Sequence, residues 1–62
     1  SGSVLDEIEG IGPVRRKALL EHFKSVERIR QASREELEAA PGMNARAAES
    51  VWTYFRVAKP RA

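Results

Sequence analysis

The stretch from Glu9 to Leu20 reads EGIGPVRRKALL, and it decides the fold. Gly10 and Gly12 flank a single isoleucine, and then a proline and three basic residues precede the return to apolar helix. Glycine adopts positive φ angles without steric cost, and proline suits the first position of a helix. The stretch is therefore typical of a tight turn that leads directly into a helix.

A second stretch, PGMN at positions 41–44, repeats the turn 32 positions further along the chain. The positions that align at this shift are Leu5 with Leu37, Ile8 with Ala40, Gly10 with Gly42, Ile11 with Met43, Gly12 with Asn44 and Leu19 with Val51. A fixed internal period indicates repeated structural units. Two copies predict a pseudo-symmetric pair of motifs, at about 4–23 and about 34–57.

Five short helical segments are predicted. We expect them over Val4 to Glu9, Pro13 to Phe23 or Lys24, Val26 to about Arg30, Arg34 to Ala40, and about Ala45 to Val57. Ser3, Ser25 and Ser33 are suited to capping three of them, and Asp6 and Glu36 would complete capping boxes. The apolar residues recur at helical spacing. The sequence thus predicts an all-α, compact five-helix bundle over residues 3–58, with 26–30 as the connecting helix and 59–62 as a fraying tail.

The composition limits the kinds of site that the chain can hold. Its 62 residues are 42% hydrophobic and 32% charged, with a net charge of +2, no cysteine and one histidine, His22. This excludes a disulfide framework and argues against a zinc site or a catalytic triad. No apolar run approaches the ~18 residues that span a bilayer. We therefore expect no cofactor, no metal and no membrane partner. The isolated domain is expected to be monomeric.

The ends of the chain suggest a piece of a larger protein. We expect Ser1 and Gly2 to be a remnant of cloning and the remainder to be a domain cut from its parent. The lack of cysteine and of a targeting segment favours a cytoplasmic parent.

The turns also predict an anion site. The second small residue of each turn opens a helix whose first amide N–H groups lack intrahelical acceptors, and the helix dipole adds positive potential there. Arg15, Arg16 and Lys17 follow within one turn. In a chain without the strands of a nucleotide-binding fold, this pattern favours contact with nucleic-acid phosphates. The alternative is a plain helix connection beside a solvated basic helix face.

On these residues the chain resembles a tandem helix-hairpin-helix domain. The runs SVLDEIEGIGPVRRKALLEHFKSVERIRQAS and EELEAAPGMNARAAESV are similar to the C-terminal domains of the UvrC subunits of bacterial excinucleases. The resemblance covers Ser3 to about Phe55. It implies a SAM-like fold, like the second domain of RuvA.

The resemblance implies a non-catalytic, DNA-binding module of a nucleotide excision repair endonuclease. Such a module would contact the sugar–phosphate backbone without base readout, prefer bubbles or single-strand/double-strand junctions, and support incision 5′ to a lesion. Its partners would be DNA, the rest of the parent nuclease and other excinuclease subunits. The contact residues implied are Gly10, Ile11, Gly12, Arg15, Arg16 and Lys17 in the first hairpin, and Gly42, Met43, Asn44 and Arg46 in the second.

Three residues depart from the pattern of these relatives. Val14 stands where a basic residue is common, Asn44 replaces a glycine, and Glu9 places a negative charge beside the first loop. Two other functions stay open. One is a dimerising protein-interaction module, which an exposed apolar strip would favour, and the other is the same fold from another DNA enzyme such as a ligase or a helicase.

Side chains outside the hairpins have simpler interpretations. Trp52 lies on the apolar face of its helix and is expected in the core rather than stacked on a base. Arg28, Arg30 and Arg34 are expected to be surface charges, the alternative being that they extend the phosphate-contacting face. The acidic residues of the first helix in each repeat suit helix N-termini better than a metal site.

Overall fold

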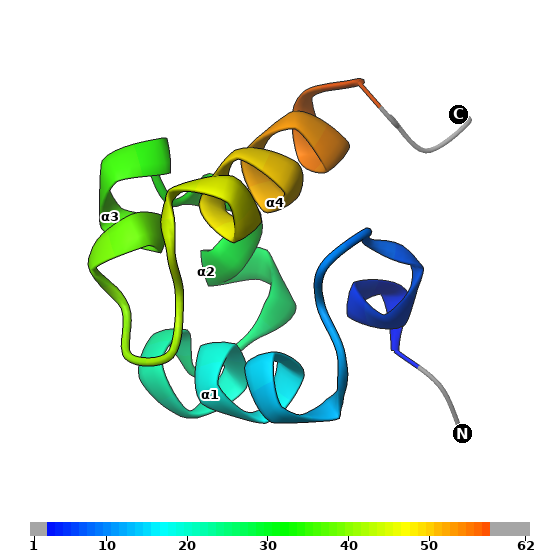
Figure 1. Cartoon of the computed structure of the whole chain (residues 1–62), viewed down its shortest axis with the longest axis vertical. Coiled ribbons are helices and arrows are strands. Elements are labelled where there is room, and N and C mark those ends of the chain that lie inside the picture. The colour runs from blue at the N-terminus through cyan, green and yellow to red at the C-terminus, as the bar shows by residue number, and fades with distance from the viewer. Residues whose placement is uncertain (1–2, 58–62) are drawn as a thin grey trace.

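The computed structural model describes residues 3–57, and every regular element in that range is helical. In chain order these are a 3-10 helix, η1 (Val4–Glu7), and four α-helices, α1 (Pro13–Phe23), α2 (Val26–Gln31), α3 (Arg34–Ala39) and α4 (Ala45–Val57). Figure 1 shows α2 in the middle of the molecule, with α1 below it and α3 and α4 above. The predicted all-α class is confirmed, whereas the expectations for Ser1, Gly2 and the tail lie outside the described residues.

The first helix is shorter than predicted and of a different type. It was expected to reach Glu9, but it is a single 3-10 turn that ends at Glu7, with Ile8 already extended (φ −91°, ψ 127°). Only four residues separate the capping Ser3 from this extended residue. A segment that short closes with an i→i+3 bond, from the Ile8 N–H to the Leu5 carbonyl (3.2 Å). The other helices begin where the sequence predicted.

Three serines begin helices, as predicted. The hydroxyl oxygens of Ser25 and Ser33 accept hydrogen bonds from the Arg28 and Glu36 N–H groups, at 3.1 and 3.0 Å. The Glu36 carboxylate accepts in return from the Ser33 N–H (2.9 Å), which completes a capping box. Ser3 and Asp6 form the second box. Each such cap contributes about 1 kcal/mol to helix stability.

Each helical element contributes one large, fully buried side chain to a single core. These side chains are Leu5, Leu19, Ile29, Leu37 and Val51, and each has 0% exposure. Leu5 and Leu37 are equivalent in the repeat, as are Leu19 and Val51, whereas Ile29 comes from the connecting helix α2. Trp52 packs against this core but is only half-buried, so its predicted core position is confirmed in part.

The two repeats share one backbone hydrogen-bonding pattern. The bonds that recur at the shift of 32 positions are Ile8 to Leu5 and Ala40 to Leu37, Ile11 to Ile8 and Met43 to Ala40, and Arg16 to Gly12 and Ala48 to Asn44. The three pairs differ in length by at most about 0.1 Å. The predicted pair of pseudo-symmetric motifs is therefore present in the backbone itself.

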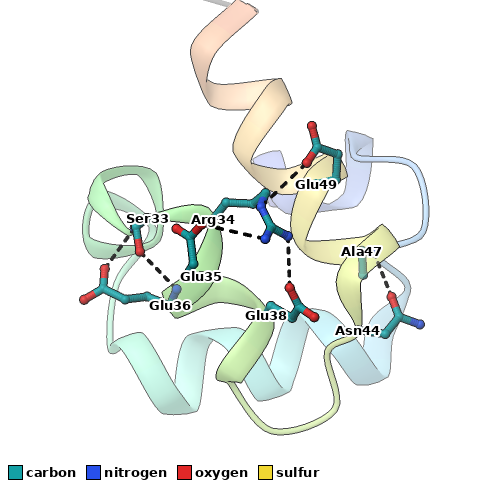
Figure 2. A network of polar contacts seen from close by, with 8 residues as sticks. All are labelled: Ser33, Arg34, Glu35, Glu36, Glu38, Asn44, Ala47 and Glu49. Atoms are coloured by element: carbon teal, nitrogen blue, oxygen red, sulfur yellow. Dashed lines mark hydrogen bonds and ion pairs between the residues drawn. The ribbon is translucent and has the colours of Figure 1, made fainter.

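An exposed ion-pair network ties α3 to α4 (Figure 2). The Arg34 guanidinium contacts Glu38 at 2.9 Å, Glu35 at 3.7 Å and Glu49 of α4 at 3.9 Å. The hydrogen bond to Glu38 is the main cause of a raised Arg34 pKa. Exposed pairs of this kind contribute little individually. They do surround Arg34 with carboxylates, which does not favour a phosphate contact for this residue.

Two carboxylates make the fold sensitive to acid. The pKa of Asp6 lies below its ordinary 3.8, chiefly because the Ser3 backbone N–H donates to it, and the pKa of Glu27 lies below 4.5 because Arg30 donates to it. A depressed folded-state pKa gives stabilisation that is complete above the ordinary value and is lost as the pH falls through the folded value. We therefore expect the unfolding temperature to hold down to about pH 5 and to fall at lower pH.

Circular dichroism melting curves at a series of pH values check this expectation. Asp6→Asn should remove part of the acid sensitivity, because the group that titrates is gone. An unfolding temperature that rises below pH 4, in the unmodified chain, would contradict it.

Candidate nucleic-acid interface

The first hairpin loop is shaped by its glycines and held by its isoleucine. Gly10 has φ +85°, in the left-handed region that favours glycine. Ile11 packs in the core with 5% exposure. Gly12 is the N-cap of α1, with extended backbone (φ −94°, ψ −169°) and open space around the position of an added Cβ. Neither the φ angle at position 12 nor the packing around it therefore requires a glycine there.

The N-terminus of α1 lacks a side-chain cap. Gly12 offers no capping oxygen, and no side chain bonds to the first turn. Pro13 has no N–H, so the free backbone donors there are those of Val14 and Arg15, and the first internal bond is from Arg16 to Gly12. The positive end of the helix dipole lies at the same place. This helix start therefore suits an anion.

The second hairpin has the same loop but a capped helix. Gly42 has φ +80°, and Met43 is half-buried. The Asn44 side-chain oxygen accepts a hydrogen bond from the Ala47 N–H at 2.8 Å, so Asn44 is the N-cap of α4 (Figure 2). One donor at the start of α4 is therefore already satisfied, whereas its counterpart in α1, the Arg15 N–H, is not.

The two hairpins lie next to each other, and Arg15 joins them. Its Nε donates to the Gly42 carbonyl and its Nη1 to the Gly10 carbonyl, both at 3.0 Å. Figure 1 shows the loop between α3 and α4 reaching towards α1. A small hollow of about 80 Å³ lies between the loops, lined by Glu9, Gly10, Arg15, Asn44, Arg46, Ala47 and Ser50.

The four basic residues expected at this surface differ in their availability. Arg15 is half-buried and bonded to the loops, and Arg16 pairs with Asp6 at 2.9 Å. Lys17 and Arg46 are exposed, and within residues 3–57 neither side chain has an ion pair or hydrogen bond. Lys17 and Arg46 are therefore the two unpaired cations of the predicted set. The sequence treats the three consecutive basic residues alike, because nothing local indicates that Asp6 folds back onto Arg16.

Ile11 and Met43 hold the loops rather than offer contact groups. Their N–H groups donate to the carbonyls of Ile8 and Ala40, at 3.1 and 3.2 Å. Their side chains are buried or half-buried. Their inclusion among the contact residues stays a prediction, which could be met only by their carbonyl groups or by side-chain edges.

The aromatic residues of α4 are engaged within the protein. The Tyr54 hydroxyl donates to Glu7 at 3.2 Å, and burial together with Glu7 raises the Tyr54 pKa. The Arg56 guanidinium lies over the Trp52 ring at 4.9 Å. Val14 and Val57, by contrast, are 81% and 74% exposed.

Within residues 3–57, no three His, Cys, Asp or Glu side chains gather as metal ligands, and no helix is long and apolar enough to cross a membrane.

Comparison with known proteins gives one consistent family. The family model for the SAM-like helix-hairpin-helix tandem matches residues 3–52. The chain is similar to UvrABC system protein C of Lachnospira eligens, at 58% identity over 53 residues, and of Methanothermobacter thermautotrophicus, at 53% over 53 residues. Each alignment covers 86% of this chain but 9% of the relative, so the chain spans about a tenth of those proteins. No solved structure matches it significantly.

Proposed function

The chain belongs to the SAM-like helix-hairpin-helix tandem family, and on that premise we propose that it is the DNA-binding domain of a UvrC-type excision repair nuclease. It holds the DNA backbone without reading sequence, with a preference for a bubble or a single-strand/double-strand junction. By doing so it supports 5′ incision by a nuclease site elsewhere in the parent protein. Its partners are DNA, the rest of that protein and the other excinuclease subunits.

The observation that carries this proposal is the joint placement of the two hairpins. The Arg15 side chain donates one hydrogen bond to each loop, and both loops line one small hollow. Each loop leads into a helix of at least 11 residues, so two positive helix ends adjoin. Two adjacent anion sites suit a ligand that carries regularly spaced phosphates.

The contacts that we propose use backbone donors and two side-chain cations. A phosphate at the first hairpin accepts from the Val14 and Arg15 N–H groups, with Lys17 alongside. A phosphate at the second hairpin meets the start of α4, with Arg46 alongside. Contacts of these kinds position a protein on DNA without selecting a base sequence. Binding is therefore expected to be steeply dependent on salt.

Lys17→Glu tests the proposal most directly. Fluorescence anisotropy should show salt-sensitive binding of the unmodified chain, strongest for a labelled bubble and weaker for plain duplex or single strand. The variant should bind every sequence about tenfold more weakly. The slope of log K against log salt should fall by about one, since one phosphate contact is removed.

Arg28→Glu is the matched control, because it makes the same charge change on the exposed side of α2, which supplies no hairpin residue. It should leave affinity within about twofold. Equal losses in both variants would show that only net charge matters and would overturn the hairpin assignment. No binding to any DNA at low salt would overturn the proposed function, and a concentration-dependent dimer would then favour the protein-interaction module.

A further inference from the structure

One guanidinium group satisfies the same carbonyl in both repeats. Gly10 and Gly42 are equivalent at the shift of 32 positions, and their φ angles, +85° and +80°, give them matching backbone orientations. Arg15 bonds both carbonyls at 3.0 Å, across sequence separations of 5 and 27 residues. The planar guanidinium presents donors in a fixed fork. The distance between its two acceptors is thereby set by the side chain itself.

Only the first repeat has an arginine at this position. At the shift of 32, Arg15 aligns with Ala47, which is 3% exposed and packs in the core. The second hairpin thus has no arginine at the equivalent position, and its Gly42 carbonyl accepts from the arginine of α1 instead. Ala18 of α1 lies beside the same turn, because its Cβ is 3.7 Å from the place that a Cβ added at Gly42 would take. Arg15 therefore supplies a polar link between the hairpins, and Ala18 marks how close α1 lies to the second turn.

We propose that Arg15 is a positioning residue, which sets the separation of the two hairpins so that both engage DNA at once. The inference rests on the proposed function. It gives the Arg15 side chain a different role from the direct phosphate contact that the sequence suggests. Two linked sites bind far more tightly than either alone only if their geometry permits simultaneous contact. Without the Arg15 link, the second hairpin could still contact a phosphate by itself. The domain would lose the gain in affinity that comes from both hairpins binding at once.

The test compares Arg15→Lys with Lys17→Gln on two DNA ligands. Arg15→Lys keeps the charge but lacks a planar fork for two separate carbonyls. It should lower affinity for a bubble about tenfold, through the lost bivalency. Affinity for a short single strand should stay within twofold, and the salt slope should not change. Lys17→Gln should weaken binding to both ligands and reduce the salt slope by about one.

Nuclear magnetic resonance reports the link itself, without DNA. In the unmodified chain the Arg15 Nε–H should exchange with solvent more slowly than the Nε–H of exposed Arg28. In Arg15→Lys the amide shifts of Ile11 and Met43 should move, because their peptide groups contain the two carbonyls. The nuclear Overhauser effect between Gly42 and the Ala18 methyl group should weaken. The exchange measurement keeps the proposal testable even if the variant folds poorly.

Three results would overturn the inference. Equal losses on bubble and single strand, with a reduced salt slope, would make Arg15 a direct phosphate contact. Unchanged binding together with unchanged Ile11 and Met43 shifts would show that no link exists. Fast exchange of the Arg15 Nε–H would show the same. Failure of the unmodified chain to bind DNA is a separate result, which refutes the proposed function and with it the role of the link in binding.

Discussion

Gly12→Asp is expected to remove most DNA binding while making the domain more stable. The backbone of Gly12 is extended, and an added Cβ meets nothing within 4 Å, so the aspartate fits without rearrangement. Its carboxylate would accept from the free N–H groups of the first turn of α1 and would interact favourably with the helix dipole. It would thereby occupy the site proposed for a phosphate with a negative charge of the protein's own.

The two effects differ in sign, which makes the experiment decisive. A better cap and a favourable dipole interaction add about 0.5–1 kcal/mol, which raises the unfolding temperature of a domain this small by roughly 2–8 °C. One or two charge-assisted hydrogen bonds to phosphate are lost, so affinity for a bubble should fall about tenfold to a hundredfold. Thermal melting and fluorescence anisotropy measure the two quantities on the same sample.

Two further variants separate the cap from its charge. Gly12→Asn adds a capping oxygen without charge, as Asn44 does in the second hairpin, and should weaken binding less than the aspartate. Gly12→Ala adds only a Cβ and should leave affinity within about twofold. If Gly12→Asp were more stable and still bound DNA as tightly as the unmodified chain, the start of α1 would not be a phosphate site.

The predictions from sequence that succeeded depend on local chemistry. The caps Ser3 and Ser33 each have an acidic partner three residues further on, and the glycine turns are contiguous, so their structures follow from short segments. The repeat carries this local information into the tertiary fold, because Leu5, Leu37, Leu19 and Val51 align in sequence and meet in the core.

The predictions that changed depend on contacts between distant segments. The Arg15 bond to Gly42 spans 27 residues, and the Arg16 pair with Asp6 spans 10. Neither has a local signal, so the sequence treats the three consecutive basic residues alike, although among the described residues 3–57 only the Lys17 side chain of the three lacks a partner. The first helix ended early for a different reason. Only one helical turn lies between the capping Ser3 and the extended Ile8. The spacing of the apolar residues does not indicate this early end.

Ile29→Ala is expected to destabilise the fold strongly. Ile29 lies on α2, has 0% exposure, and is the one large, fully buried side chain without an equivalent in the repeat. Truncating a buried isoleucine costs about 2–5 kcal/mol, depending on how far the cavity collapses. A domain of this length has a total stability of roughly 3–9 kcal/mol. The variant should therefore lose a large fraction of the stability of the domain.

Leu37→Ala is the matched control, because Leu37 is equally buried but belongs to a repeat. Chemical denaturation of both variants should give losses of similar size, since both side chains fill one common core. Ile29→Val should cost only about 0.5–1.5 kcal/mol. If Ile29→Ala cost less than 1 kcal/mol while Leu37→Ala cost 2 or more, α2 would be a linker lying on the core. The two repeats would then pack directly against each other, and the connecting helix would contribute little to the position of the hairpins.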